Sequence, residues 1–183
     1  HFPCKLLIAT SNWLKMNHSA TANEIIEVTQ EELSRASLQK TPQEVLAVFV
    51  QPSYDLNPEV IKSSLCLALD DVQDPGNLGT IIRLADWFGI EHIFCSTGTA
   101  DVYNPKTVQA TMGALARVKV HYCSLPQLIE SLTDIPVYGT FLNGNIIYAE
   151  SLSAHGLIVM GNEGKGVSPE VERLINNKLY IPN

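Results

Sequence analysis

From about residue 60 onward, short apolar runs alternate with segments in which apolar positions recur every three to four residues. An apolar run between turn signals is typical of a buried strand, and the longer period is typical of a helix with one buried face. The pattern predicts strands at 65–69, 92–95, 118–122, 137–141, 157–160 and 178–181, and helices at 77–88, 105–116, 125–132 and 169–176. Strands that alternate with helices favour right-handed crossovers, so we expect an α/β fold: a mostly parallel sheet with helices on both faces.

The start of the chain follows a different pattern, which predicts a small α/β domain. Strands are expected at 6–9, 25–28 and 44–50, with a helix at 31–38. Thr29 and Glu32 have the spacing of a capping box, which would open that helix. Residues 51–58 are rich in Pro, Asn and Asp, as is typical of a linker. We therefore expect two domains, residues 1–55 and residues 60–183.

The composition is that of an ordinary globular chain, because 45% of the 183 residues are hydrophobic. No apolar run approaches the roughly 18 residues of a membrane-spanning helix, and no signal-peptide pattern is visible. Four widely spaced cysteines form no C-x-x-C pair, which argues against a zinc site or a disulfide scaffold. We expect reduced thiols, a cytoplasmic protein and no membrane partner.

The net charge of −7 argues against a broad nucleic-acid-binding face. Residues 1–60 carry four basic and seven acidic side chains, and residues 61–183 carry eight and twelve. Neither half is basic, so any contact with nucleic acid would depend on a local patch.

Polar residues converge where the strand at 65–69 runs into the next helix. The stretch Asp70–Arg83 contains a Pro-Gly turn, and Asn77 stands at the expected N-cap. Apolar positions at Leu78, Ile81, Ile82, Ala85 and Phe88 form the predicted buried face, which leaves Arg83 free. The junction is either a functional site or a well-capped helix with one solvated arginine.

A second loop of this kind follows the strand at 157–160. Residues 161–167 read Gly-Asn-Glu-Gly-Lys-Gly-Val, and a helix is expected to begin at Ser168-Pro169. Glycines allow positive φ and a close approach of a ligand to the backbone. A P-loop needs Ser or Thr after its lysine, and here Gly166 follows Lys165, so a nucleotide-phosphate site is disfavoured.

Taken together, these segments resemble the signatures of the SpoU (TrmH) branch of the SPOUT RNA methyltransferases. The first resembles the element D-x-x-x-D-P-x-N-x-G-x-x-x-R, through Asp70, Asp74, Pro75, Asn77, Gly79 and Arg83. The second resembles M-G-x-E-G-x-G, through Met160, Gly161, Glu163, Gly164 and Gly166. The strand that ends in Ile181-Pro182 resembles the start of the third element.

The resemblance implies an enzyme that transfers methyl from S-adenosylmethionine to a ribose 2′-hydroxyl of rRNA or tRNA. It also implies a C-terminal trefoil knot in residues 60–183, a substrate-binding role for residues 1–55, and a homodimer formed through residues 160–183 and the helix 77–88. The family has residues before His1 and beyond Asn183, so we expect this sequence to be truncated at both ends. That expectation leaves open a second interpretation, a catalytically silent RNA- or cofactor-binding module.

Family precedent assigns catalysis to Arg83, which activates the hydroxyl, with Asn77 and Glu163 beside it. Because a guanidinium is a poor base, we expect Arg83 to bind the adjacent phosphate and hold the hydroxyl. Asn77 would contact substrate, and Glu163 would orient Arg83 or Asn77. The alternative for Glu163 is an exposed loop carboxylate.

Strand ends supply the expected cofactor contacts, because ligands collect at the carboxyl ends of parallel strands. These contacts are Thr140, Gly161 and Ile181, although for Ile181 the sequence by itself favours a core residue. RNA contacts are expected from Arg83, Lys165, Asn104 and Lys106, with solvent exposure as the alternative for Lys165. No metal is expected, because Asp70 and Asp74 alone make a poor magnesium site.

Overall fold

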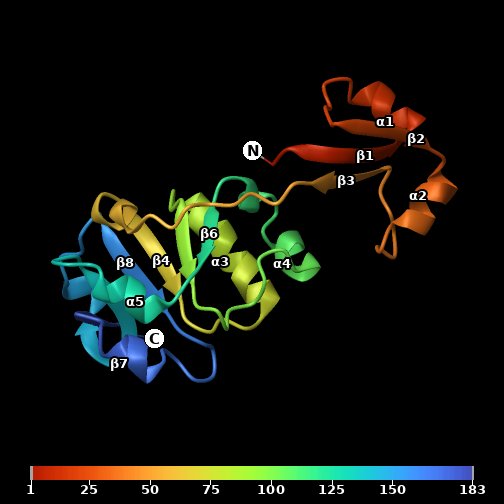
Figure 1. Cartoon of the computed structure of the whole chain (residues 1–183). Coiled ribbons are helices and arrows are strands. Elements are labelled where there is room, and N and C mark those ends of the chain that lie inside the picture. Colours follow the sequence, from red (N-terminus) through yellow and green to blue (C-terminus); the bar gives the residue numbers. More distant parts are fainter. Residues whose placement is uncertain (1, 183) are drawn as a thin grey trace. The chain divides into compact units, whose positions relative to one another are not determined.

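A computed structural model describes residues 2–182 of the chain, which folds as two compact units (Figure 1). The first unit extends to Ser53 and the second begins at Tyr54. Each unit has its own sheet, so each is described by itself. None of the helices between residues 2 and 182 has the length and apolar run that crossing a membrane would require.

The first unit is a three-stranded sheet with two short helices. Its elements are β1 (Cys4–Thr10), α1 (Ser11–Met16), β2 (Glu24–Val28), α2 (Gln30–Ala36) and β3 (Val45–Phe49). β1 is central, parallel to β2 and antiparallel to β3. Leu7, Ala9 and Leu33 are buried and form the core of this unit.

Both helices of the first unit are capped by a threonine at a strand end: Thr10 is the last residue of β1, and Thr29 directly follows β2. The predicted capping box of α2 is confirmed, since Thr29 and Glu32 bond each other's backbone N–H. Helix α1 was not predicted, although Thr10 Oγ1 accepts a bond from Trp13 N. A Thr-Ser-Asn run after a strand carries that cap signal.

The second unit contains one parallel six-stranded sheet, which confirms the predicted α/β class. The strands are β4 (Leu65–Leu69), β5 (His92–Cys95), β6 (Lys119–Tyr122), β7 (Val137–Ile146), β8 (Gly156–Met160) and β9 (Asn177–Tyr180). Their order is β6-β5-β4-β8-β7-β9. The helical elements are η1 (Pro58–Lys62), α3 (Pro75–Trp87), α4 (Pro105–Ala110), η2 (Ala114–Ala116), α5 (Leu125–Glu130), η3 (Ile147–Ala149) and α6 (Pro169–Glu172).

Two apolar layers cover the two faces of this sheet. One joins the sheet to α5 and α6 through residues such as Phe94, Leu125 and Val171. The other joins it to α3 and η2 through residues such as Leu78 and Ile82. Fully burying one such side chain stabilises the fold by about 1.5–3 kcal/mol. Because side chains of this kind are buried on both faces, both helical layers stabilise the sheet.

The start and end of α3 differ from the prediction. Asp74, not Asn77, is the N-cap, because Asp74 Oδ1 accepts a bond from Asn77 N at 2.8 Å and Pro75 occupies the first helical position. Asn77 is therefore three residues inside α3, with its side chain free for other contacts. Phe88 was placed on the buried face, but it follows the last helical residue and is 73% exposed.

Other helices are shorter than predicted. The helix expected at 105–116 breaks after Ala110, because Met112 and Gly113 have φ values of 51° and 86°. The helix expected at 125–132 ends at Glu130, and the side chain of its N-cap residue Ser124 makes no cap bond. The helix expected at 169–176 ends at Glu172.

Candidate active site

The two motif loops lie side by side because β4 and β8 are neighbouring parallel strands. Leu69 pairs with Met160 at the ends of these strands. The contact continues one residue further, where Asp70 N donates to Met160 O at 2.8 Å. Parallel strands end at the same edge of the sheet, so the segments after residues 69 and 160 meet there.

Two side chains then join these loops directly. The carboxylate of Asp70 is buried, and its Oδ2 accepts a bond from Ser168 N at 2.7 Å, where α6 begins. Asn162 Nδ2 donates to Asp71 O at 2.8 Å. Asp71 has a φ of 60° and its N–H donates to Ser96 Oγ, so the carbonyl that Asn162 reaches is itself held in place.

The second loop is a tight hairpin. Asn162 and Gly166 exchange two backbone hydrogen bonds of 2.9 Å, and Gly166 has a φ of 72°. We predicted Gly161 as a cofactor contact, on the reasoning that a β-carbon would crowd the ligand. A β-carbon there would instead lie 2.2 Å from the Gly166 carbonyl carbon and 2.3 Å from Val167 N. The loop's own return path therefore requires Gly161.

Asn77 and Glu163 are brought together although they are far apart in the sequence. Asn77 Nδ2 donates to Glu163 Oε1 at 2.8 Å. Both residues are exposed, so the pair lies on the surface where a large substrate can reach it. Of the two partners that the sequence left open for Glu163, the structure gives Asn77.

Lys106 lies at the same edge of the sheet, at the start of α4. Its Nζ donates to Asp74 Oδ2 at 2.9 Å. This bond, together with the N–H of Asn77, lowers the pKa of the Asp74 carboxyl. Asn104 was predicted to face RNA, but its Oδ1 accepts a bond from Lys106 N and caps α4.

The two remaining predicted cations are open to solvent. Arg83 is exposed on α3, and within residues 2–182 its guanidinium forms no ion pair or hydrogen bond. Lys165 is exposed at the tip of the hairpin, where only its backbone N–H is held, by Asn162 Oδ1 at 3.0 Å. Both side chains are therefore available to an anionic ligand.

An apolar pocket of about 260 Å³ opens beside the ends of β7, β8 and β9. Thr140 and Ile181 both line it, together with Leu65, Tyr138, Gly139, Ile147, Leu152, Ser153, Ile158, Met160 and Leu179. Gly161 directly follows Met160 but is not among the lining residues. An apolar wall with a few hydroxyl groups suits a flat, partly apolar ligand such as a nucleoside.

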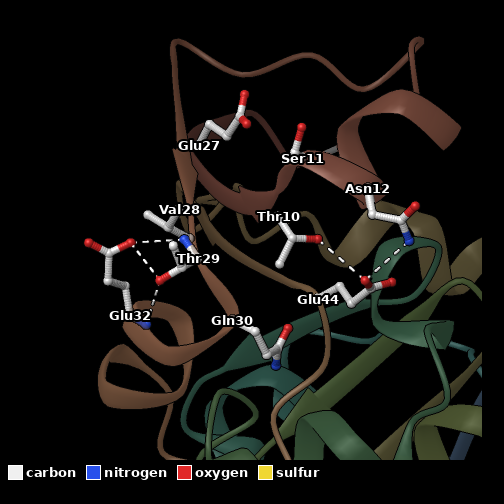
Figure 2. A pocket seen from close by; sticks show the side chains of 9 residues that line it. All are labelled: Thr10, Ser11, Asn12, Glu27, Val28, Thr29, Gln30, Glu32 and Glu44. Atoms are coloured by element: carbon white, nitrogen blue, oxygen red, sulfur yellow. Dashed lines mark hydrogen bonds between the residues drawn. The ribbon is translucent and has the colours of Figure 1, made fainter.

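The first unit has a separate, open hollow of about 690 Å³ at the ends of β1 and β2 (Figure 2). Glu44 Oε1 accepts bonds from Thr10 Oγ1 at 3.4 Å and Asn12 Nδ2 at 3.3 Å. Glu27 and Glu32 also line it. Three carboxylates repel phosphate, so this hollow is not built for an RNA backbone.

The Asp70 carboxylate accepts a bond from the backbone of Ser168, and the Asp74 carboxylate accepts bonds from Asn77 N and Lys106 Nζ. Between residues 2 and 182, no three His, Cys, Asp or Glu side chains gather closely enough to hold a metal. All four cysteines are free thiols.

Comparison with known proteins identifies this arrangement. Residues 64–183 match the model of the SpoU rRNA Methylase family. The chain belongs to that family. The matched region contains both loops and the whole six-stranded sheet described above.

Two relatives of this SpoU family member make the likeness specific. The 23S rRNA (guanosine(2553)-2′-O)-methyltransferase RlmP of Bacillus subtilis is 33% identical over 158 residues, which are 85% of this chain and 62% of RlmP. A TrmH-family protein of Porphyromonas gingivalis is 42% identical with a TM-score of 0.90, over 100% of this chain and 74% of that one. The chain thus spans about three fifths of the length of RlmP.

A third comparison concerns the cofactor. The SpoU methyltransferase AviRb of Streptomyces viridochromogenes, solved in complex with AdoMet, is 26% identical with a TM-score of 0.83. The match covers 100% of this chain and 75% of AviRb.

Proposed function

We propose that this chain transfers methyl from S-adenosylmethionine to a ribose 2′-hydroxyl of ribosomal RNA. The observation that carries the proposal is the hydrogen bond between Asn77 on α3 and Glu163 in the hairpin after β8. It joins the two motifs, and α3 also carries the exposed Arg83. The names of RlmP, a 23S rRNA 2′-O-methyltransferase, and of AviRb, solved with AdoMet, support the reaction and its substrate. A cytoplasmic location suits an RNA substrate and four free thiols.

Thr140 and Ile181 would hold the cofactor's adenosine part against the apolar wall of the 260 Å³ pocket. The fit rests on the chemistry of that wall, which offers hydrocarbon surface together with the hydroxyls of Thr140 and Ser153. Gly161 would act through the hairpin, since its close approach to Gly166 shapes the loop next to Met160. When bound, the cofactor supplies an electrophilic methyl group.

Arg83 would bind the RNA phosphate next to the reacting ribose. A guanidinium is planar and stays charged at neutral pH, so it suits two-point contact with a phosphate and does not suit proton removal. Fixing that phosphate would hold the hydroxyl in line with the methyl group. Such alignment is a large source of acceleration in a displacement reaction.

Lys106 and Lys165 would extend the phosphate contacts away from Arg83. Lys165 is exposed at the hairpin tip. Lys106 lies against Asp74, so an incoming phosphate would compete with that carboxylate for its ammonium group. Asn104 would contribute by capping α4 and thereby placing Lys106.

The first unit, residues 1–55 in our division, would bind RNA through bases. The hollow in Figure 2 is lined by Asn12, Thr10 and Gln30 together with carboxylates. The carboxylates can accept hydrogen bonds from the amino groups of unpaired bases. Its charge disfavours phosphate, which leaves the phosphate contacts to the second unit.

A homodimer would complete the RNA-binding surface. The end of α3 and the residue after it expose a cluster of large apolar side chains: Leu84 (51%), Trp87 (82%) and Phe88 (73%). Such a cluster is typical of an interface, and two-fold homodimers are the commonest soluble oligomers. Because Arg83 precedes this cluster on the same helix, an interface formed by it and by residues 160–183 would bring two sites close together.

The competing candidate is a module that binds the cofactor or RNA but does not catalyse methyl transfer. Titration calorimetry with S-adenosylmethionine and transfer of labelled methyl to an unmodified 23S rRNA transcript separate the two candidates. Binding followed by methyl transfer supports the enzyme. Binding without transfer to any ribosomal RNA would favour the silent module.

A further inference from the structure

Asn162 makes more contacts within the candidate site than its neighbours do. Its Oδ1 accepts bonds from Gly164 N at 2.9 Å and Lys165 N at 3.0 Å, and its Nδ2 donates to Asp71 O at 2.8 Å. Its backbone also pairs with Gly166 in both directions. One residue therefore folds the hairpin and ties it to the loop that leads into α3.

Glu163 lies between the groups that Asn162 holds. Asn162 precedes it, and the N–H groups of the two residues after it are bound to Asn162 Oδ1. The backbone of Glu163 is therefore fixed on both sides, although its side chain is exposed. The carboxylate is aimed at α3 because Asn162 also anchors the hairpin to Asp71.

The carboxylate in turn sets which end of the Asn77 amide faces outward. An ionised carboxylate can only accept hydrogen bonds, so Asn77 must turn its NH₂ group toward Glu163. The oxygen Oδ1 of Asn77 then makes no hydrogen bond within residues 2–182 and is left as an acceptor.

We propose that Asn162 is a positioning residue that acts through Glu163, so that Asn77 presents Oδ1 to the attacking ribose hydroxyl. This inference rests on the proposed methyl transfer. A hydroxyl that donates to Oδ1 has its O–H bond directed at Asn77, which leaves an oxygen lone pair free to face the methyl group. An amide oxygen is too weak a base to take the proton, so its contribution is orientation. In the transfer the ribose oxygen would form its bond to the methyl carbon as the methyl–sulfur bond breaks, S-adenosylhomocysteine would leave, and the hydroxyl proton would pass to water.

The chemistry of the site requires both ends of the Asn162 amide. Aspartate would keep the acceptor for Gly164 and Lys165 but would set a negative oxygen against the Asp71 carbonyl. Alanine would lose all three side-chain bonds. Asn162→Asp thus replaces one hydrogen bond, to Asp71 O, by a repulsion between two oxygens and keeps the other two bonds.

The chain also provides a matched control in Asn176, which directly precedes β9 and bonds to the backbone at the start of β7. Its Nδ2 donates to Ile135 O at 3.0 Å and its Oδ1 accepts from Val137 N at 2.8 Å. Asn176→Asp therefore makes the same change, an acid facing a backbone carbonyl, outside the candidate site.

The experiment compares Asn162→Asp, Asn162→Ala and Asn176→Asp with the unchanged chain. Methyl transfer to an unmodified 23S rRNA transcript gives kcat and KM, calorimetry gives the S-adenosylmethionine Kd, and ¹⁵N NMR reports the side-chain amide of Asn77. We expect Asn162→Asp to lower kcat about 10- to 100-fold, with KM and Kd within about threefold, and to shift the Asn77 amide signals. Asn176→Asp should leave kcat and those signals unchanged.

A double substitution tests the route through Glu163. In a chain that already carries Glu163→Ala, Asn162→Asp should lower kcat by less than about threefold. An undiminished effect in that background would overturn the inference, as would equal kcat losses in Asn162→Asp and Asn176→Asp.

The NMR signal keeps the test independent of the proposed function. If the unchanged chain transfers no methyl, a shift in Asn162→Asp alone still supports the positioning role, and unshifted Asn77 signals overturn it.

Discussion

Asn77 Nδ2 lies 2.8 Å from Glu163 Oε1, across a sequence separation of 86 residues. The contact exists because β4 and β8 are adjacent, so that the segments following both strands share one edge of the sheet. It joins two short motifs at the surface, and Arg83 follows Asn77 by six residues on the same helix, α3.

Replacing Glu163 should impair turnover more than cofactor binding. Glu163→Ala removes a charge-assisted hydrogen bond worth roughly 1.5–3 kcal/mol, so kcat should fall about 10- to 150-fold. Glu163→Gln should lose less, because its amide oxygen can still accept from Asn77. Steady-state kinetics with a 23S rRNA transcript measure both effects, and equal losses in the two variants would contradict this role.

Gly161→Ala should damage the hairpin without unfolding the second unit. The new β-carbon would lie within 2.4 Å of backbone atoms of Gly166 and Val167, so the loop must open. We expect the Asn77 side-chain amide signals to shift and methyl transfer to drop at least tenfold, with a cooperative thermal transition retained. The control is Gly164→Ala, where the nearest atom to the new β-carbon is Asn162 Oδ1 at 3.6 Å, an ordinary van der Waals distance. Similar losses in both variants would argue against crowding as the cause.

Trp87→Glu should weaken self-association. Trp87, the last residue of α3, is 82% exposed between Leu84 and Phe88, and a buried charge there would oppose a two-fold contact. Sedimentation at micromolar concentration should show the dimer for the unchanged chain and a shift toward the monomer for the variant. Leu38→Glu, at a fully exposed apolar position of the first unit, is the control. A variant that sediments like the unchanged chain would exclude this surface.

Acid should destabilise the second unit through a histidine pair on β5 and β6, in which His121 is buried and His92 is half-buried. His92 Nδ1 and His121 Nε2 lie 3.1 Å apart, and burial together with His92 and Lys119 lowers the pKa of His121 to about 4. An unfolded histidine has a pKa near 6.5, so the unfolded chain takes up a proton first as pH falls. The stabilisation is present above about pH 6.5 and is lost between about pH 6.5 and 4.

Denaturant unfolding across that range measures the effect. The free energy of unfolding should fall with a slope of up to ~1.4 kcal/mol per pH unit for His121. His121→Phe should have a flatter profile, because the ring that stacks on Phe94 is kept and the titrating group is removed. An unchanged slope in that variant would assign the acid sensitivity to other groups.

Local signals predicted much of this structure. The period of apolar positions located the strands of the second unit, and Thr29 with Glu32 gave the start of α2. Where two local signals competed, the prediction was wrong: Asp74-Pro75 opens α3, although Asn77 is also a good cap. Positive φ at Met112 is a backbone conformation that its side chain does not indicate.

The candidate site was predicted as a set of residues but not as contacts. Motif spacing pointed to Asn77, Glu163 and Arg83, yet the bond between the first two depends on strand order, which the sequence pattern does not give. The pairing of Lys106 with Asp74 depends on how α4 packs against α3. Asn162 was passed over because the motif M-G-x-E-G-x-G does not specify its position, and only its bonds to three other residues suggest its role.

The central claim is most directly tested by the site of methylation and its dependence on Arg83. Labelled S-adenosylmethionine is incubated with an unmodified 23S rRNA transcript, and the product is digested with alkali, which leaves a 2′-O-methylated linkage uncut. We predict one alkali-resistant dinucleotide with the unchanged chain. Arg83→Ala should lower its yield at least 100-fold while the S-adenosylmethionine Kd changes less than about threefold, or ~0.7 kcal/mol. Label on a base, or an Arg83→Ala variant that keeps full transfer, would contradict the account.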